Sequence, residues 1–197
     1  MTELEYTVDS VLAQFDCDKW LDRYWAFLLQ ENQKVNLVSR ETDLPQFRRL
    51  VAEALLPFSQ ISKSFDSYLD IGSGGGIPAI PLLLSGIAKG EGMLYERTKK
   101  KAVALARLLE NLEISRAKVV PESFGERLAN RTFSLITLSY VSLTPMLLES
   151  IRSHLSPGGI LVYYSRPEFE PKNIRAQYFT YSHSGSDTRK RFSILTK

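Results

Sequence analysis

A glycine-rich stretch from Asp70 to Pro78, Asp-Ile-Gly-Ser-Gly-Gly-Gly-Ile-Pro, contains the residues best suited to bind a ligand. Gly72, Gly74 and Gly76 let the backbone take positive φ values and approach a ligand closely. An apolar run precedes the stretch, and its proline is suited to open a helix whose first N–H groups are unpaired. The order of residues predicts a strand, a nucleotide-binding turn and a helix.

Two common nucleotide-binding turns do not fit this stretch. A dinucleotide fingerprint counted from Gly72 requires a glycine where Ile77 stands, and a P-loop requires a following Gly-Lys-Ser/Thr. The spacing Asp70-x-Gly72-x-Gly74-x-Gly76 instead resembles the first motif of the class I S-adenosylmethionine-dependent methyltransferases. In that class the turn holds the aminoacyl and ribose parts of the cofactor.

Glu96 ends the next apolar run, at the position where proteins of this class carry an acid that binds the ribose hydroxyls. A carboxylate suits this task because it accepts hydrogen bonds from both hydroxyls of a diol, and charged acceptors form the stronger bonds. The pairing of the turn with Glu96 therefore favours a site for S-adenosylmethionine.

The elements that must position these residues alternate between short apolar runs and helical stretches, a pattern typical of parallel strands joined by crossover helices. Two β-rich runs near the C-terminus, joined by a polar segment, predict an antiparallel hairpin at the edge of the sheet. The expected strands are 67–71, 92–96, 117–120, 133–139, 160–165, 177–181 and 191–195. The expected crossover helices are 78–84, 99–111, 124–128 and 145–155.

The N-terminal part has apolar residues at helical spacing, which predicts two amphipathic helices within residues 6–38 and another that begins near Asp43 and ends by Pro57. We expect residues 1–64 to form a helical extension and residues 65–197 to form the cofactor-binding domain. The predicted fold class is α/β, Rossmann-like, with a mostly parallel seven-stranded sheet.

The composition of the 197 residues, 44% hydrophobic and 24% charged, is that of an ordinary globular protein. No apolar run is long enough to span a membrane, and the acidic N-terminus is unlike a signal sequence, so we expect a cytoplasmic protein. Cys17 is the only cysteine, and His154 and His183 are the only histidines, so neither a disulfide nor a metal site is expected. The net charge of +3 is compatible with an RNA partner.

Four segments resemble the glucose-inhibited division protein B family, the methyltransferases that act on guanine N7 of 16S ribosomal RNA. They are the turn from Gly72 to Pro78, Asn-Gln-Lys-Val-Asn-Leu-Val from Asn32 to Val38, Leu-Ser-Pro-Gly-Gly-Ile-Leu-Val from Leu155 to Val162, and the closing Arg191 to Leu195. Other segments differ from the family pattern. Arg49 to Ala54 lacks a histidine and a serine, Glu122 to Gly125 replaces Gly-Arg-Ala-Glu, Tyr140 ends a segment in which the family has an arginine, and Ser165 replaces a lysine.

The resemblance implies S-adenosylmethionine as the cofactor and RNA, in 16S rRNA or the small ribosomal subunit, as the partner. The expected cofactor residues are Asp70, Gly72, Ser73, Gly74, Gly76, Ile77, Glu96, Phe124, Gly125 and Ser139. Ser139 and Tyr140 are candidates for catalysis, and Arg48, Arg49 and Tyr140 for contact with RNA.

A methyl group on a sulfonium is already activated, so the protein chiefly has to align it with its acceptor. A guanine N7 carries a free lone pair and requires no general base, and Tyr140 is suited to stack on the base. Two alternatives stay open: a methyltransferase for another acceptor, and a non-catalytic homologue that binds the cofactor or has lost it. The sequence does not indicate an oligomeric state.

Overall fold

The computed structural model describes residues 2–61, 63–125, 128 and 130–197. In these residues the strands form one eight-stranded sheet in the order β1-β7-β8-β6-β5-β2-β3-β4. The strands are Thr2–Tyr6 (β1), Phe65–Ile71 (β2), Ala88–Tyr95 (β3), Ala117–Val120 (β4), Phe133–Leu138 (β5), Leu155–Tyr163 (β6), Arg175–His183 (β7) and Lys190–Thr196 (β8).

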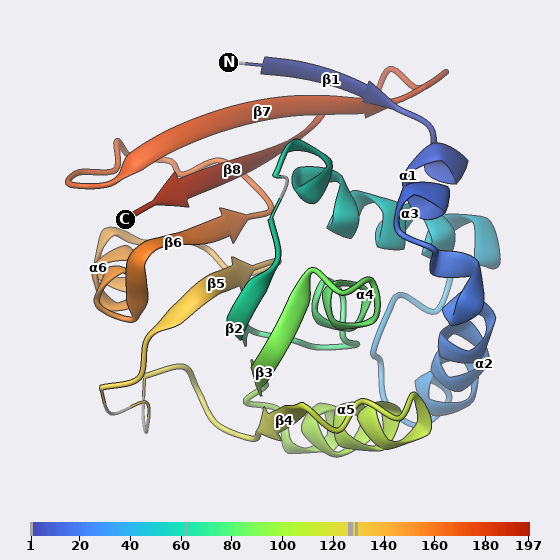
Figure 1. Ribbon diagram of the computed structural model, residues 1–197. Coiled ribbons are helices and arrows are strands. Elements are labelled where there is room, and N and C mark those ends of the chain that lie inside the picture. Colours follow the sequence, from blue (N-terminus) through green and yellow to red (C-terminus); the bar gives the residue numbers. More distant parts are fainter. Residues whose placement is uncertain (1, 62, 126–127, 129) are drawn as a thin grey trace.

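Helices surround this sheet (Figure 1). They are Val8–Gln14 (α1), Leu21–Asn32 (α2), Leu44–Leu55 (α3), Ala79–Leu84 (α4), Lys99–Asn111 (α5) and Pro145–Ser153 (α6), with short 3-10 turns at Cys17–Lys19 (η1) and Leu56–Gln60 (η2). No helix in the described part of the chain has the length and apolar character that a membrane crossing requires.

The five strands β2 to β6 run parallel, and only β8 runs against its neighbours β6 and β7. The chain passes from β2 outward through β3 and β4, and then returns to the other side of β2 for β5 and β6. Such a reversal leaves a crevice at the carboxyl ends of the two strands where the order changes, and ligands of open α/β sheets bind there. In this sheet the reversal lies between β2 and β5.

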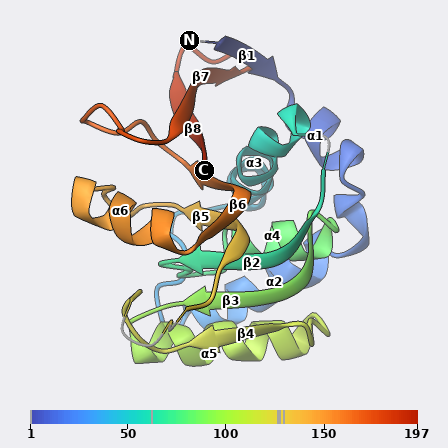
Figure 2. The ribbon, with the colours of Figure 1, turned by 60° about the vertical axis from the view of Figure 1, so that its left-hand side comes forward.

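Two apolar cores lie on opposite faces of the sheet. The larger core joins the sheet to residues from α1 to α5, and the smaller one includes Leu148 and Ile151 of α6. Figure 2 shows α6 on one side of the sheet and α3 and α4 on the other. Side chains alternate between the faces along each strand, and Tyr68 of β2 faces the larger core whereas Leu69 faces the smaller one.

The helix predicted to begin near Asp43 is confirmed as α3, which begins at Leu44 with Asp43 as its N-terminal cap. The Asp43 side chain accepts the Gln46 backbone N–H at 2.8 Å, and the Gln46 side chain accepts the Asp43 backbone N–H at 3.3 Å, which forms a capping box. Pro45 lies in the first turn, where its missing N–H removes no helical hydrogen bond. Pro57 lies in the following 3-10 turn η2 instead of ending α3 directly, because α3 ends at Leu55.

The α/β class with a mostly parallel sheet and a C-terminal antiparallel hairpin is confirmed, but the sheet has eight strands where seven were expected. The additional strand is β1, which pairs in parallel with β7 from Thr2↔Phe179 to Tyr6↔His183 (Figure 1). Its partner is remote in sequence, so no local pattern indicates the pairing. The division of the chain at residue 65 stays a prediction.

The expected helix at 124–128 lies partly outside the described residues. Phe124 and Gly125 form a turn, and Leu128 belongs to no helix or strand. Most other expected elements agree with the structure to within a few residues, and α5 and β4 agree in both bounds.

Candidate active site

The glycine turn follows β2 at the reversal of the strand order. Gly72, Gly74 and Gly76 have φ values of 78°, 50° and 90°, in the left-handed region that favours glycine. The backbone N–H groups of Gly72 and Ser73 both donate to the Tyr95 carbonyl, at 2.9 and 3.0 Å. These bonds attach the start of the turn to the last residue of β3.

Glu96 follows Tyr95 directly and also contacts the turn. Its side chain is buried, with Oε2 accepting the Gly74 N–H at 3.0 Å and Oε1 accepting the Thr98 N–H at 2.7 Å. A carboxylate offers about four lone-pair sites, so two hydrogen bonds leave capacity for further donors. Glu96 lines the neighbouring cleft and can therefore accept hydrogen bonds from a ligand there.

A cleft of about 1150 Å³ opens at the carboxyl ends of the parallel strands. One side is formed by the glycine turn and the residues after β3 and β4, another by the residues after β5, and a third by the segment between α2 and α3 with the start of α3. Its lining includes Asn36, Leu37, Arg40, Gln46, Arg49, Gly72, Ser73, Gly74, Gly75, Ile77, Glu96, Arg97, Lys101, Phe124, Ser139, Tyr140 and Lys190.

The segment after α2 is the wall that sequence reasoning did not assign to the site. The Asn32 side chain at the end of α2 accepts the N–H groups of Leu37 and Val38, at 2.7 and 3.1 Å. A Cβ built on Gly75 would lie 2.7 Å from the Leu37 carbonyl oxygen, so the segment is packed directly against the glycine turn. Residues 32–38 resemble the family pattern, but that resemblance does not indicate that the segment lies against the glycine turn.

Asp70 lies beneath the turn and is not among the residues that line the cleft. Its carboxyl is fully buried and accepts a hydrogen bond from the Thr137 hydroxyl, which is also bonded to the Tyr68 hydroxyl. Its other oxygen, Oδ2, has no hydrogen-bond partner among the described residues. Burial raises the pKa of Asp70 from 3.8 to about 6, because desolvation disfavours the charged form.

The cleft brings together most, but not all, of the predicted cofactor residues. Gly72, Ser73, Gly74, Ile77, Glu96, Phe124 and Ser139 line it. Gly76 and Gly125 do not. Gly76 is buried, and a Cβ there would meet Ile80 and Tyr24, so this glycine is required by packing against the helices.

Arg48 and Arg49, predicted together as RNA contacts, have different surroundings. Arg48 forms ion pairs with Asp9 at 3.1 Å and Asp18 at 3.9 Å and does not line the cleft. Arg49 lines the cleft, and none of the ion pairs between described residues involves it. The adjacent positions point in different directions because successive residues of a helix are about a quarter turn apart.

Further cations surround the cleft. Arg97 and Lys101 follow β3 and, like Arg49, take part in no ion pair among the described residues. Lys190 also lines the cleft, but its amino group binds the Glu53 carboxylate at 2.7 Å. Arg49, Arg97 and Lys101 therefore give the cleft a positive character that suits a polyanion.

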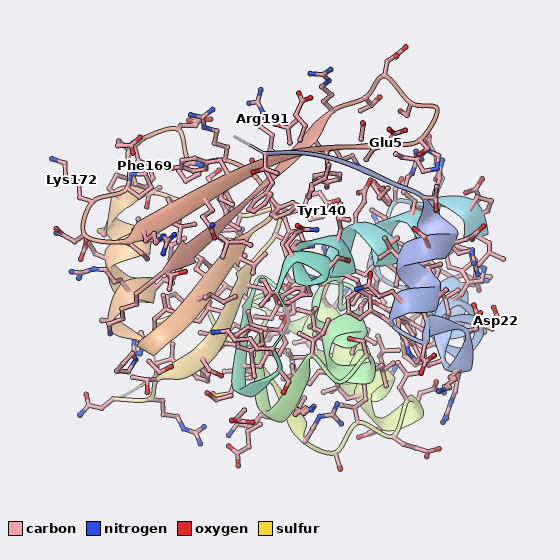
Figure 3. All side chains as sticks on the ribbon, turned by 45° about the horizontal axis from the view of Figure 1, so that its top comes forward. Glu5, Asp22, Tyr140, Phe169, Lys172 and Arg191 are labelled. Carbon is pink, nitrogen blue, oxygen red and sulfur yellow. The ribbon has the colours of Figure 1, made fainter. Side chains whose placement is uncertain are left out.

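Tyr140 follows β5 at the mouth of the cleft. Its side chain is 90% exposed, and its φ of 55° is in the left-handed region, which is uncommon for a residue with a large side chain. In Figure 3 it lies on the side of the molecule where β1 and β7 run. Strained backbone conformations concentrate at functional sites, so an exposed aromatic ring held in this way is a candidate contact for a planar ligand.

The family described as rRNA small subunit methyltransferase G matches residues 18–192 of the chain. The chain belongs to this family. The small subunit methyltransferase G of Chlorobium limicola is 32% identical over 180 residues, which cover 88% of this chain and 79% of that protein. The Chlorobium phaeobacteroides protein is 34% identical over 141 residues, 70% of this chain but only 62% of its own length. The Helicobacter acinonychis protein is 33% identical over 144 residues, 73% of this chain and 79% of that protein.

Solved structures with the same fold include methyltransferases. An O-methyltransferase from Bacillus cereus in complex with SAH superposes with a TM-score of 0.65 at 16% identity, over 89% of this chain and 90% of that one. Cofactor-bound Rv0187 from MTB superposes with a TM-score of 0.61 at 15% identity, over 92% and 95% of the two chains. At this identity the likeness establishes the fold of the family member described here, and not its substrate.

The residues around the cleft fit a bound S-adenosylmethionine. A Cβ at Gly72 would lie 2.8 Å from the Val141 side chain, so the turn and the segment after β5 approach so closely that only glycine leaves space between them. Glu96 offers a carboxylate for the ribose hydroxyls. The cleft volume is also sufficient, since sites for small ligands commonly enclose about 300–1,000 Å³.

Proposed function

We propose that this protein transfers the methyl group of S-adenosylmethionine to RNA of the small ribosomal subunit. The observation that carries the proposal is the contact of the glycine turn with Glu96 at a cleft lined by Arg49, Arg97 and Lys101, three cations that form no ion pair with another described residue. Membership of the rRNA small subunit methyltransferase G family supports the same substrate. With such a substrate, we expect the protein to act in the cytoplasm.

Within this proposal the two parts of the chain have different tasks. Residues 65–197 form the cofactor-binding domain, in which Gly72 and Gly74 shape the floor and Glu96 holds the ribose. Residues 1–64 supply the opposite wall, in which Arg49 faces the cleft from α3. A cation at this wall suits the phosphates of a substrate that enters from outside, because each neutralised phosphate adds affinity.

The cofactor supplies a methyl group that is already activated on a sulfonium. The protein then has to hold the acceptor in line with it and exclude competing water. We propose guanine N7 as the acceptor, since its lone pair requires no proton removal. This fits a cleft whose lining contains neither His154 nor His183. Ser139 and Tyr140 are the residues best placed to touch the acceptor, Tyr140 by stacking on the base.

The direct test is methyl transfer from radiolabelled S-adenosylmethionine into small ribosomal subunits isolated from cells that lack the endogenous N7 methylation. We expect label in 16S rRNA and none in fully methylated subunits, bulk RNA or a panel of small metabolites. Label in another acceptor would replace the substrate and keep the enzyme class. No transfer despite cofactor binding would indicate a non-catalytic homologue.

Gly72→Asp is the loss-of-binding control for this test. It adds a side chain at φ 78°, within 2.8 Å of Val141, and a negative charge in the cleft that contains Glu96. Gly86→Asp is the matched variant, because Gly86 has a φ of 73°, does not line the cleft and would meet nothing within 4 Å. We expect Gly72→Asp to abolish cofactor binding and transfer, and Gly86→Asp to retain both.

A further inference from the structure

Tyr24 connects the N-terminal helices to the turn of the cofactor site. It lies on α2 with no exposed surface, and its ring packs edge to face against Phe47 of α3, with centroids 5.1 Å apart. Its hydroxyl donates a buried hydrogen bond of 2.7 Å to the carbonyl oxygen of Gly75. A residue far from the turn in sequence therefore binds the backbone of the turn directly.

With the hydrogen bond from Tyr24, both the carbonyl and the N–H of one peptide group in the turn are bonded. The carbonyl of the Gly75–Gly76 peptide accepts from Tyr24, and the N–H of the same peptide donates to the Ser73 carbonyl at 2.7 Å. A peptide group bonded at both ends cannot rotate without losing a buried hydrogen bond. The other side of the turn is held by the bond from Gly74 to Glu96.

The turn packs so closely against α2 and the segment after it that positions 75 and 76 have no space for a side chain. A Cβ on Gly76 would lie 3.1 Å from the Tyr24 hydroxyl, and a Cβ on Gly75 would lie 2.7 Å from the carbonyl oxygen of Leu37. The turn is thus enclosed between β3 on one side and the N-terminal segment on the other. Tyr24 itself does not line the cleft, so it can act on a ligand only through the turn.

We infer that Tyr24 is a positioning residue of the cofactor site: its hydroxyl holds the Gly75 carbonyl and thereby keeps Gly72 to Gly74 in the shape that receives the cofactor. The inference rests on the proposed function, since it assumes that S-adenosylmethionine binds at this turn. It assigns to the N-terminal helices a part in cofactor binding, in addition to the substrate wall described above.

The test compares Tyr24→Phe with Tyr164→Phe in the full chain. Both replacements keep the ring and remove one hydroxyl that donates to a backbone carbonyl, Gly75 for Tyr24 and Ala54 for Tyr164. Only the first carbonyl belongs to the turn. Dissociation constants for S-adenosylmethionine and S-adenosylhomocysteine are measured by calorimetry, together with the thermal unfolding of each variant.

We expect Tyr24→Phe to weaken cofactor binding by about five- to twenty-fold, the effect of one lost buried hydrogen bond, and Tyr164→Phe to bind as the unaltered chain does. In methyl transfer, the KM for the cofactor should rise in Tyr24→Phe while kcat at saturating cofactor stays within about two-fold, because the tyrosine does not touch the reacting atoms. A merely structural role would affect both tyrosine variants alike.

Two results would overturn the inference alone: unchanged affinity of Tyr24→Phe, or an equal loss of affinity in both variants, in each case with normal binding by the unaltered chain. Absence of cofactor binding by the unaltered chain would overturn the proposed function and this inference together. The measurement on the unaltered chain therefore separates the two failures.

Discussion

The carboxylate of Glu96 accepts the backbone N–H of Gly74 at 3.0 Å, so the residue after β3 and the turn after β2 form a single unit. Glu96 thus bonds to the turn and also lines the cleft. A variant at this position therefore has to be assessed both for stability and for ligand binding.

Glu96→Gln should weaken S-adenosylmethionine binding by about 1–3 kcal/mol, because the ribose hydroxyls lose a charged acceptor. The amide nitrogen of glutamine would also face a backbone N–H, of Gly74 or Thr98, where an oxygen is required. Calorimetric titration gives the affinity, and Glu110→Gln on the exposed side of α5 serves as the control. An effect below about 0.3 kcal/mol on binding would remove Glu96 from the cofactor site.

Arg49→Ala should weaken RNA binding and lower the salt dependence of the affinity by about one released counterion, because the side chain lines the cleft and has no acidic partner among the residues that the structure describes. Arg48→Ala is the matched control on the same helix. It removes ion pairs to Asp9 and Asp18 and should change stability by no more than about 1 kcal/mol, with the salt slope unaltered. Filter binding at several salt concentrations measures both. Equal slopes for the two variants would argue against a phosphate contact at Arg49.

Tyr140→Asn should stabilise the protein by about 1 kcal/mol and reduce methyl transfer. Asparagine tolerates a φ of 55° better than tyrosine, and little burial is lost because the ring is 90% exposed. Loss of stacking should lower kcat/KM for RNA by about 5- to 150-fold, the equivalent of 1–3 kcal/mol. Tyr140→Phe keeps the ring and should keep the activity. Full activity of the asparagine variant would mean that the exposed ring has no part in substrate binding.

Asp70 should make the protein less stable as the pH rises from about 4 to about 6. The folded-state pKa of about 6 lies above the unfolded value of 3.8, so in this window the folded chain retains a proton that the unfolded chain has lost. Stability therefore falls with increasing pH and, above about 6, stays lower by roughly 3 kcal/mol from this group.

Asp70→Asn removes this contribution and still accepts the hydrogen bond of Thr137. Denaturant unfolding between pH 4 and 8 should show a smaller decline in the variant than in the unaltered chain. We also expect weaker binding of the positively charged cofactor, since a negative charge beneath the turn is lost. An unchanged pH profile would show that Asp70 does not titrate in this range.

Much of the fold could be predicted because its signals are local. The apolar runs of β2 to β6 and the helical spacing of α5 lie within short windows, and the bounds of α5 and β4 were predicted correctly. β1 could not be predicted in this way. Its five residues include only two apolar side chains, Leu4 and Tyr6, and it becomes a strand only through its pairing with β7.

The site shows the same limit. The turn and Glu96 are recognisable because a spacing and an acid after a strand identify them, and the structure brings them into contact. Arg48 pairs with Asp9 of α1 and Asp18 of η1, whereas Arg49 lines the cleft. This difference depends on how α3 packs against the preceding elements. The contact of Tyr24 with Gly75 likewise depends on how α2 packs, which a one-dimensional pattern does not contain.

The parallel pairing of β1 with β7 has a consequence for folding during synthesis of the chain. Residues 2–6 are translated long before residues 179–183, their partners in the ladder. Until residues 179–183 are made, residues 2–6 lack their partner in the sheet, and β1 cannot pair while the central strands assemble. One edge of the sheet is therefore completed late in translation, by the meeting of an early and a late part of the chain.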